Sequence, residues 1–194
     1  SETRHTARFV CTTDKTMAQF ASFYPGAMSE ARLPELGPIA SAVGQPDYVL
    51  IRADDPDGRL RHTHECRQRG YKFIADPSQQ LAFADGATIR QLIDGADYLL
   101  TNEYEAALTE QKTGWTAEDI ADRVHTRVIT RGKEGVTIER KGEDPVEVSV
   151  AREVRRADPT GVGDAFRAGF LTGLAADLGL RHSAELGSML ATTM

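Results

Sequence analysis

Four short apolar runs recur along the chain with helical stretches between them, and this alternation limits the fold more than any other feature. The runs are centred near residues 48, 72, 98 and 128, and residues 47–51 are almost continuously apolar, as expected of a strand buried on both faces. Residues 56–69 and 85–94 have the pattern of helices. Because a strand–helix–strand alternation favours parallel strands, the sequence predicts an α/β fold with a mostly parallel central sheet.

Further elements are expected at the two ends of this series. Residues 136–140 and 146–150 are predicted to pair as a hairpin at the sheet edge. Residues 3–12 are rich in threonine and partly alternate, which predicts a strand that ends near residue 13. A last helix is expected to begin at Ser183.

Composition excludes several classes of partner. The chain has 194 residues, 40% of them hydrophobic, which suits one domain with a substantial core. A net charge of −6 without a basic run argues against nucleic acid or an anionic membrane as a partner. The two cysteines, Cys11 and Cys66, are expected to be free thiols of a reducing compartment. No apolar run reaches membrane-spanning length and no signal peptide is visible, so a cytoplasmic location is expected.

The richest chemical signal is a glycine loop that leads into a helix. Asp158–Pro159 is expected to end the structural element that precedes the loop. Gly161–Val162–Gly163 can turn sharply and present bare backbone N–H groups. A helical pattern starts at Asp164, and its many small residues predict that this helix lies close against a sheet. Free N–H groups and the positive end of the helix dipole favour an anion.

Asp164 falls in the first turn of that helix, where the dipole favours an ionised carboxylate that could act as a general base. An anion cradle beside a base suits phosphoryl transfer to a hydroxyl. The alternative is that Asp164 is only a helix cap and the glycines only shape a turn. A dinucleotide fingerprint fits poorly, since it needs a small residue where Phe166 stands, and no P-loop motif occurs in the chain.

Polar residues follow two other predicted strands. Gln79 and Gln80 stand where ligands bind in open parallel sheets, although an ordinary turn explains them equally well. Asn102 and Glu105 follow the next strand, and they could serve phosphate and Mg²⁺ or form a capping box. His62 and Cys66 share a helix face, but two ligands do not make a zinc site.

Three ordered motifs together resemble a known family. Residues 158–170 read D-P-T-G-V-G-D-A-F-R-A-G-F, which looks like the C-terminal signature of ribokinase-like (PfkB-type) carbohydrate and nucleoside kinases. Upstream, residues 102–105 match N-x-x-E and residues 130–135 match T-x-G-x-x-G. The resemblance implies Asp164 as catalytic base and the backbone of Gly161, Val162 and Gly163 as anion hole. It also implies Asn102 and Glu105 near Mg²⁺ through water, with ATP contacted by Gly163 and by Thr130, Arg131, Gly132, Lys133, Glu134 and Gly135.

Within this family, residues 21–32 and 76–81 resemble the actinobacterial type of adenosine kinase. That resemblance implies that Phe9 and Phe23 sandwich a purine, whereas in isolation both aromatics would be assigned to the core. It also favours substrate contact by Gln79 and Gln80. The expected reaction is conversion of adenosine to AMP in purine salvage. A kinase of a free sugar such as ribose or fructose is one alternative, and a catalytically incomplete nucleotide-binding module is another.

The family fold is a three-layer α/β/α sandwich, and residues 1–194 are expected to form a single, incomplete domain of this type. Residues 1–13 are expected to supply a strand near the lid. The family's N-terminal strands and sugar-binding Gly-Gly motif have no counterpart here, nor has its adenine-binding loop. The resemblance implies ATP and Mg²⁺ as cofactors and a nucleoside or sugar as partner. It also admits a monovalent cation such as K⁺ and a homodimer.

Overall fold

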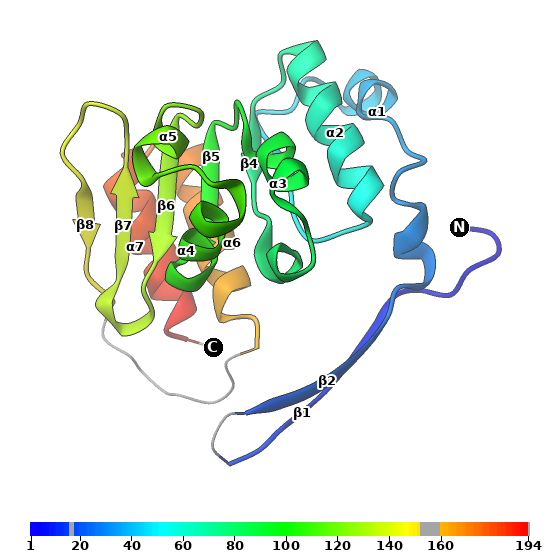
Figure 1. Ribbon diagram of the computed structural model, residues 1–194, viewed down its shortest axis with the longest axis horizontal. Helices are drawn as coiled ribbons and strands as arrows, with labels where there is room; N and C mark the ends of the chain where they lie inside the picture. The colour runs from blue at the N-terminus through cyan, green and yellow to red at the C-terminus, as the bar shows by residue number, and fades with distance from the viewer. Residues whose placement is uncertain (16–17, 152–159, 194) are drawn as a thin grey trace.

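A six-stranded sheet forms the centre of the molecule in a computed structural model that describes residues 1–15, 18–151 and 160–193 (Figure 1). The strands follow one another in chain order across the sheet. The first four are parallel and the last two are antiparallel, so the predicted edge hairpin is confirmed. The strands are β3 (Val49–Ile51), β4 (Phe73–Ala75), β5 (Tyr98–Asn102), β6 (Thr126–Thr130), β7 (Val136–Glu139) and β8 (Val146–Val148).

The helices cover both faces of this sheet and complete three layers. In Figure 1, α3, α4 and α5 lie in front of the strands and α6 and α7 lie behind them. The predicted α/β sandwich with a mostly parallel sheet is therefore confirmed. The helices are α1 (Leu36–Val43), α2 (Pro56–Arg69), α3 (Gly86–Ile93), α4 (Glu103–Thr113), α5 (Ala117–Ala121), α6 (Val162–Ala175) and α7 (Gly179–Ala191), with short 3₁₀ turns η1 (Gly26–Glu30), η2 (Ser78–Ala82) and η3 (Gly132–Glu134).

The strands divide their side chains between two hydrophobic cores. On β4, Phe73 packs into the core under α2, α3 and α5, whereas Ile74 packs into the core under α6 and α7. Leu99 and Leu100 of β5 separate in the same way. Because successive side chains of a strand point to opposite faces, a strand buried on both sides must be apolar throughout. This is why the parallel strands were recognisable as continuous apolar runs.

The small residues of α6 meet a different partner from the one predicted. A Cβ atom on Gly169 would lie 2.6 Å from the Cα of Gly187, and one on Gly173 would lie 2.5 Å from the Cα of Ser183. Both contacts are with α7, so these glycines permit close helix–helix packing. The prediction that they face the sheet was wrong, because Phe166 and Phe170 occupy the sheet side of α6.

Two strands lie outside the central sheet and form a separate antiparallel hairpin. They are β1 (Arg8–Thr13) and β2 (Gln19–Tyr24). The first was predicted to begin at residue 3, and the second was not predicted. All six residues of β2 are exposed, so this strand has little burial pattern and exists through its pairing with β1. Figure 1 shows the hairpin running below the sheet, toward the region where α6 begins.

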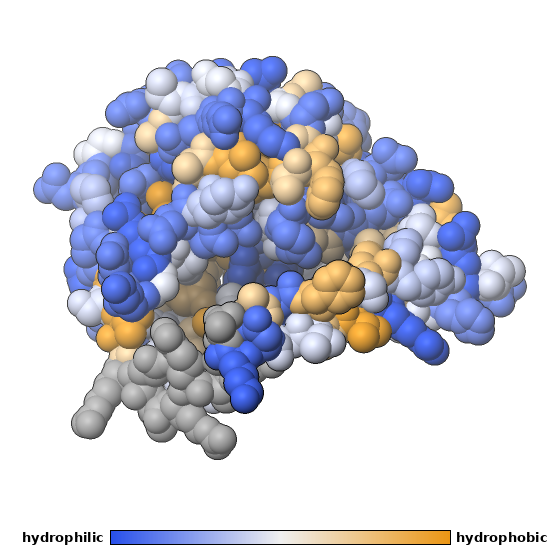
Figure 2. Space-filling view, turned by 60° about the horizontal axis from the view of Figure 1, so that its bottom comes forward, coloured by the Kyte–Doolittle hydropathy of each residue, from blue (hydrophilic) through white to orange (hydrophobic). Residues whose placement is uncertain are grey.

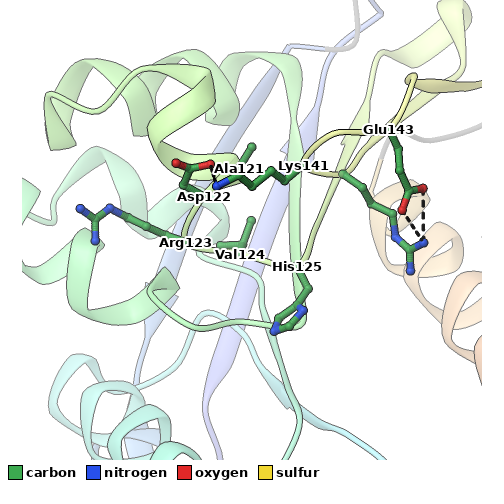
Figure 3. A pocket seen from close by; sticks show the side chains of 8 residues that line it. Ala121, Asp122, Arg123, Val124, His125, Lys141 and Glu143 are labelled. Carbon is green, nitrogen blue, oxygen red and sulfur yellow. Dashed lines mark hydrogen bonds and ion pairs between the residues drawn. The ribbon is translucent and has the colours of Figure 1, made fainter.

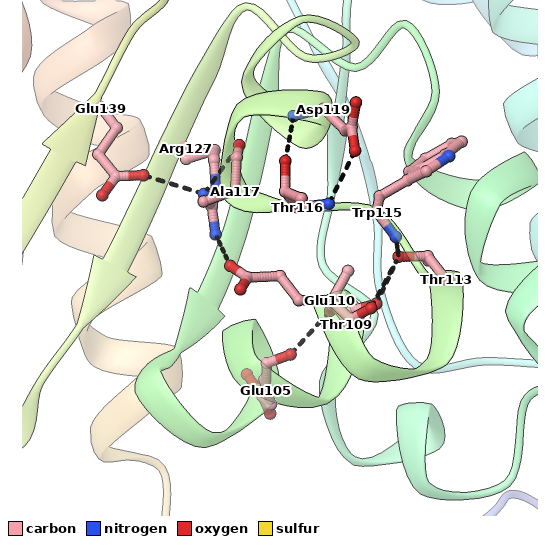
Figure 4. A network of polar contacts seen from close by, with 10 residues as sticks. All are labelled: Glu105, Thr109, Glu110, Thr113, Trp115, Thr116, Ala117, Asp119, Arg127 and Glu139. Carbon is pink, nitrogen blue, oxygen red and sulfur yellow. Dashed lines mark hydrogen bonds and ion pairs between the residues drawn. The ribbon is translucent and has the colours of Figure 1, made fainter.

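A buried arginine joins four elements on the α4 face of the sheet (Figure 4). Arg127 of β6 is 3% exposed. Its guanidinium lies 3.0 Å from a carboxylate oxygen of Glu110 in α4 and 3.1 Å from one of Glu139 in β7. It also donates to the backbone oxygen of Ala117 in α5 at 3.3 Å. Two carboxylates and a carbonyl thus compensate the buried charge.

Within the described ranges, no helix combines the length and the apolar character that crossing a membrane requires.

Candidate active site

Polar side chains follow each of the four parallel strands at one edge of the sheet, the lower edge in Figure 1. We call this edge the rim. Arg52 follows β3, Asp76 follows β4, Asn102 ends β5 and Thr130 ends β6. Parallel strands end on the same side, and the pairing of Asn102 with Thr130 places these two residues side by side. In open parallel sheets this edge is where ligands bind.

The first turn of α6 lies at the same rim. Gly161 is the N-cap residue and has a φ of +86°, a conformation that favours glycine. No side chain caps this helix. Among the described residues, no acceptor takes the N–H groups of Val162, Gly163 and Asp164, while the N–H of Ala165 bonds to Gly161. With respect to the described residues, these three N–H groups are open to an anion, and their role as a cradle stays a prediction.

Asp164 lies in this first turn, and its side chain is 61% exposed. Its Oδ1 accepts from the Nη2 of Arg52 at 2.6 Å. No described residue contacts its Oδ2, so one carboxylate oxygen is left to accept a proton. Asp164 forms no side-chain cap, which makes the cap alternative wrong.

Three charged residues next to Asp164 were not recognised as a group in the sequence. Asp76 is fully buried between two arginines, with its Oδ2 2.8 Å from the Nε of Arg52 and 2.5 Å from the Nε of Arg167. Arg167 also donates from Nη2 to Asp76 Oδ1 at 2.9 Å. Burial alone would lower the pKa of Arg52, but hydrogen bonds and charge from Asp164 and Asp76 outweigh it and raise that pKa. Their signal was position, since Arg52 and Asp76 each directly follow an apolar strand.

Asn102 and Glu105 form a capping box at the start of α4. Asn102 Oδ1 accepts from the N–H of Glu105 at 2.8 Å, and Glu105 Oε2 accepts from the N–H of Asn102 at 2.8 Å. This confirms the capping prediction and leaves Glu105 Oε1 without a contact among the described residues. Those residues contain no group of three or more His, Cys, Asp or Glu that could hold a metal ion. The carboxylate of Glu105 and the amide of Asn102 are oxygen groups of the kind that suits Mg²⁺, which keeps several waters and takes few carboxylates.

The loop from Thr130 to Gly135 continues the rim beside Asn102. Thr130 Oγ1 donates to the backbone oxygen of Thr101 at 3.4 Å, and the N–H of Arg131 donates to that of Gly135 at 2.8 Å. Gly135 has a φ of +97°, and a Cβ there would lie 2.1 Å from the oxygen of Val148. The buried Nε of Arg131 has no hydrogen-bond partner in the described part of the chain. A ligand with acceptor oxygens would satisfy it.

The hairpin presents an aromatic face toward this rim. Phe9 and Phe23 are directly paired across β1 and β2, so both point to one face of the hairpin, and they are 56% and 53% exposed. Gln19 lies on the same face, and its Nε2 donates to Thr160 Oγ1 at 2.8 Å, next to Gly161. Figure 2 views this end of the molecule and shows the surface hollowed between the hairpin and the body. The assignment of both aromatics to the core is wrong.

The two glutamines after β4 differ in their surroundings. Gln79 is exposed, and its Oε1 accepts from the hydroxyl of Ser78, a non-glycine residue with a φ of +55°. Gln80 donates to the oxygen of Asp54 at 2.7 Å and accepts from the Nη1 of Arg59. Both polar groups of Gln80 are therefore used inside the protein, whereas the amide nitrogen of Gln79 is available to a ligand.

The remaining candidates lie away from the rim. Cys66 is fully buried, which raises the pKa of its thiol to about 12, and His62 bonds to the oxygen of Pro34. A hollow of about 400 Å³ lies at the opposite end of β6 (Figure 3). Its lysine, Lys141, pairs with Asp122 at 2.8 Å. Asp158 and Pro159, the first two residues of the glycine-loop motif, lie outside the described residues.

Comparison with known proteins identifies the family of the chain. The family model described as pfkB family carbohydrate kinase matches residues 1–194. The chain belongs to the PfkB family of carbohydrate kinases. Family membership, inferred from three short motifs, is thereby confirmed.

The most informative relatives are nucleoside kinases and a ribokinase. The structure of Burkholderia thailandensis nucleoside kinase in complex with inosine matches with a TM-score of 0.90 and 36% identity, covering 98% of this chain and 62% of that one. The same enzyme in complex with ADP-inosine matches with a TM-score of 0.84. A nucleoside kinase of Methanocaldococcus jannaschii is 26% identical over 99% of this chain, and a ribokinase of Lactococcus lactis is 27% identical over 84% of it. The chain spans 61% and 52% of the lengths of these last two relatives.

Proposed function

We propose that this protein is an ATP-dependent kinase that transfers the γ-phosphoryl group of ATP to the hydroxyl of a nucleoside. The observation that carries the proposal is the first turn of α6. There, among the described residues, the Asp164 carboxylate has one oxygen without a contact and three neighbouring backbone N–H groups have no acceptor. A base and an anion cradle at this spacing suit phosphoryl transfer. Membership of a carbohydrate kinase family supports the same reaction class.

In the proposed mechanism, the acceptor hydroxyl lies against Oδ2 of Asp164. That oxygen takes the hydroxyl proton while the hydroxyl oxygen forms a bond to the γ-phosphorus of ATP. The bond from that phosphorus to the β,γ-bridging oxygen breaks, and ADP leaves with the electron pair. The N–H groups of Val162, Gly163 and Asp164 would stabilise the transferring phosphoryl group, as the free amides at a helix start can.

The nucleotide would lie along the rim from the glycine loop to the loop of residues 130–135. The Nε of Arg131, which has no partner among the described residues, and the exposed Lys133 suit its phosphates. Mg²⁺ would be held through water by Glu105, whose Oε1 contacts no described residue, and by Asn102 beside it. When bound there, the ion would neutralise charge on the phosphates. A monovalent cation and a homodimer stay predictions.

A nucleoside is favoured as acceptor because the hairpin turns two aromatic rings toward the rim. Phe9 and Phe23 are each more than half exposed, and such rings can stack on a purine. The Burkholderia relative was solved in complex with inosine, which supports a purine nucleoside. Adenosine is our specific candidate, with AMP as product. The ribokinase relative supports the alternative of a free sugar such as ribose.

The test is ADP release from Mg·ATP with adenosine, inosine, ribose and fructose offered in turn. Asp164→Asn is the blank, because it keeps the shape of the side chain and removes the base. We expect turnover with a purine nucleoside and none in the blank. Turnover with ribose and with no nucleoside would contradict the nucleoside assignment and support the alternative of a sugar kinase. ADP release that persists in the blank at the same rate would contradict the kinase mechanism altogether.

A further inference from the structure

We infer that Arg52 is a positioning residue for the proposed base, and that it holds Asp164 through a buried support made by Asp76 and Arg167. The inference rests on the proposed function, since it assigns a role around the same carboxylate. It concerns one juxtaposition: the ends of β3 and β4 are joined to the first turn of α6 by a chain of four alternating charges.

Arg52 uses different edges of its guanidinium for two carboxylates. Its Nη2 donates to Asp164 Oδ1 at 2.6 Å, and its Nε donates to Asp76 Oδ2 at 2.8 Å. A planar guanidinium with fixed donor directions sets the orientation of both acceptors, which a flexible ammonium group would not do. Arg52 is only 36% exposed, so this is not a freely solvated surface pair.

The support behind Arg52 is fully buried. Asp76 has no exposed surface, and its two oxygens are taken by Arg52 and Arg167. A buried carboxylate needs such partners, so its position is tightly determined by them. Arg167 lies one turn after Asp164 on α6, and a Cβ on Gly163 would lie 2.5 Å from its Nη1. Gly163 therefore leaves room for the Arg167 side chain in addition to its place in the amide cradle.

For catalysis, the consequence is that the two oxygens of the Asp164 carboxylate have different roles. Oδ1 of Asp164 is held by Arg52, and Oδ2 is free of contacts with the described residues. The acceptor hydroxyl is thus offered one oxygen in one orientation. Asp76 offsets the positive charge of Arg52. The Arg52 guanidinium is therefore already paired with Asp76 when it orients Asp164. Loss of such orientation, with misplacement of about 1 Å, can slow a reaction about 100-fold.

The test compares Arg52→Gln with Arg61→Gln, a matched control on α2. Arg61 is 37% exposed, lies 3.0 Å from Glu35, which is 57% exposed, and donates to the backbone oxygen of Leu33 at 3.2 Å, so the control removes a similarly exposed ion pair that involves no rim residue. We expect Arg52→Gln to lower kcat about 10- to 100-fold and to change the KM for ATP by less than about threefold. Arg52→Lys should restore only part of the rate, since a lysine cannot bridge both carboxylates in the same geometry. Arg61→Gln should match wild type.

A second measurement does not depend on turnover. Amide hydrogen exchange of residues 162–170 should be several-fold faster in Arg52→Gln than in wild type or Arg61→Gln, because one tether of the first turn of α6 is gone. Unchanged exchange, an unchanged kcat, or a raised KM for ATP with normal kcat would each overturn the inference; the last would make Arg52 a nucleotide-binding residue. A wild-type protein that releases no ADP would contradict the proposed function, whereas the exchange result would still decide the role of Arg52.

Discussion

At the scale of single residues, the carboxylate of Asp164 combines the properties that a general base needs. It lies in the first turn of a helix, it is more than half exposed, and one of its oxygens has no described partner. Asp76 is a carboxylate at the same rim with the opposite character, since it is fully buried and paired on both oxygens. Of these two carboxylates, only that of Asp164 is available to a substrate.

The substitution Asp164→Asn should lower kcat about 100- to 10,000-fold, the range of general-base catalysis, because an amide cannot accept the hydroxyl proton. ATP affinity should change less than about threefold, since the proposed ATP contacts use backbone N–H groups and other side chains, which the substitution leaves in place. Steady-state kinetics and nucleotide titration measure the two effects. Asp57→Asn is the matched control, because Asp57 also lies in the first turn of a helix, α2, and its exposed carboxylate pairs with Arg32, which is not a rim residue. A mutant at Asp164 that keeps near wild-type kcat would eliminate it as the base.

At the scale of elements, α6 has two faces with different tasks. Phe166 and Phe170 pack on the sheet, and Gly169 and Gly173 allow α7 to approach closely. The N-terminus of α6 is thereby held at the rim by packing along its whole length. The hairpin of β1 and β2 is tied to that rim through Gln19 and Thr160, 2.8 Å apart. The aromatic face of the hairpin and the start of α6 thus lie on the two sides of the depression between the hairpin and the body (Figure 2).

The close contact of α6 and α7 should not tolerate a branched side chain. Gly169→Val should lower the free energy of unfolding by about 2–4 kcal/mol, because its Cβ would meet the backbone of Gly187 at 2.6 Å. Ala168→Val, at the neighbouring exposed position of the same helix, should cost less than about 1 kcal/mol. Urea unfolding of the two variants measures the difference. Equal losses would show that the contact with α7 can relax.

The aromatic face of the hairpin should discriminate acceptors. Phe9→Ala should lower kcat/KM for a nucleoside about 10- to 100-fold through lost stacking, and leave turnover of any free sugar nearly unchanged. Val10→Ala is the control, because Val10 is its neighbour on β1 and points to the opposite face of the hairpin. Acceptor kinetics with adenosine and ribose measure this. If Phe9→Ala and Val10→Ala had the same effect, the proposed stacking on Phe9 would be wrong.

At the scale of the whole molecule, two cores on either side of one sheet hold the rim in place. The core under α2, α3 and α5 supports the ends of β3 and β4, and the core under α6 and α7 supports the glycine loop. The buried Arg127 joins β6 and β7 to the helices on one side. The rim residues come from elements that are far apart in the chain, so the site depends on this global packing.

The Arg127 network should show an asymmetry in stability. Arg127→Met should cost about 1–3 kcal/mol, because Glu110 and Glu139 are partly exposed and can be hydrated once the arginine is gone. The double variant Glu110→Gln/Glu139→Gln should cost more, about 3–5 kcal/mol, because it leaves a buried guanidinium without a carboxylate. Denaturant unfolding gives both values, and the reverse order would contradict this account. Arg140→Met, which breaks an exposed pair with Glu143, should cost less than about 1 kcal/mol.

Much of this molecule was predictable because its signals are local. The α2 helix was predicted with its observed bounds, since Asp55 caps it and Gly70 ends it. The capping box of Asn102 and Glu105 was likewise visible as a spacing of three. The start of α7 was placed four residues too late, because its first turn is stabilised by tertiary packing of Leu180. The strand β2 was missed for a similar reason, since its pairing and not its burial makes it a strand.

The strand–helix alternation, the two-sided burial of the parallel strands and the glycine loop that starts α6 with Asp164 in its first turn could all be read from the sequence. Each of these follows from periodicity, capping or backbone freedom within a few residues. Three-dimensional packing was needed to show that Arg52 pairs with that carboxylate and is backed by Asp76 and Arg167, and that Gln19 meets Thr160. These partners are brought together by the parallel order of the strands and by the packing of α6, and ion pairs between distant segments leave no periodic mark in a sequence.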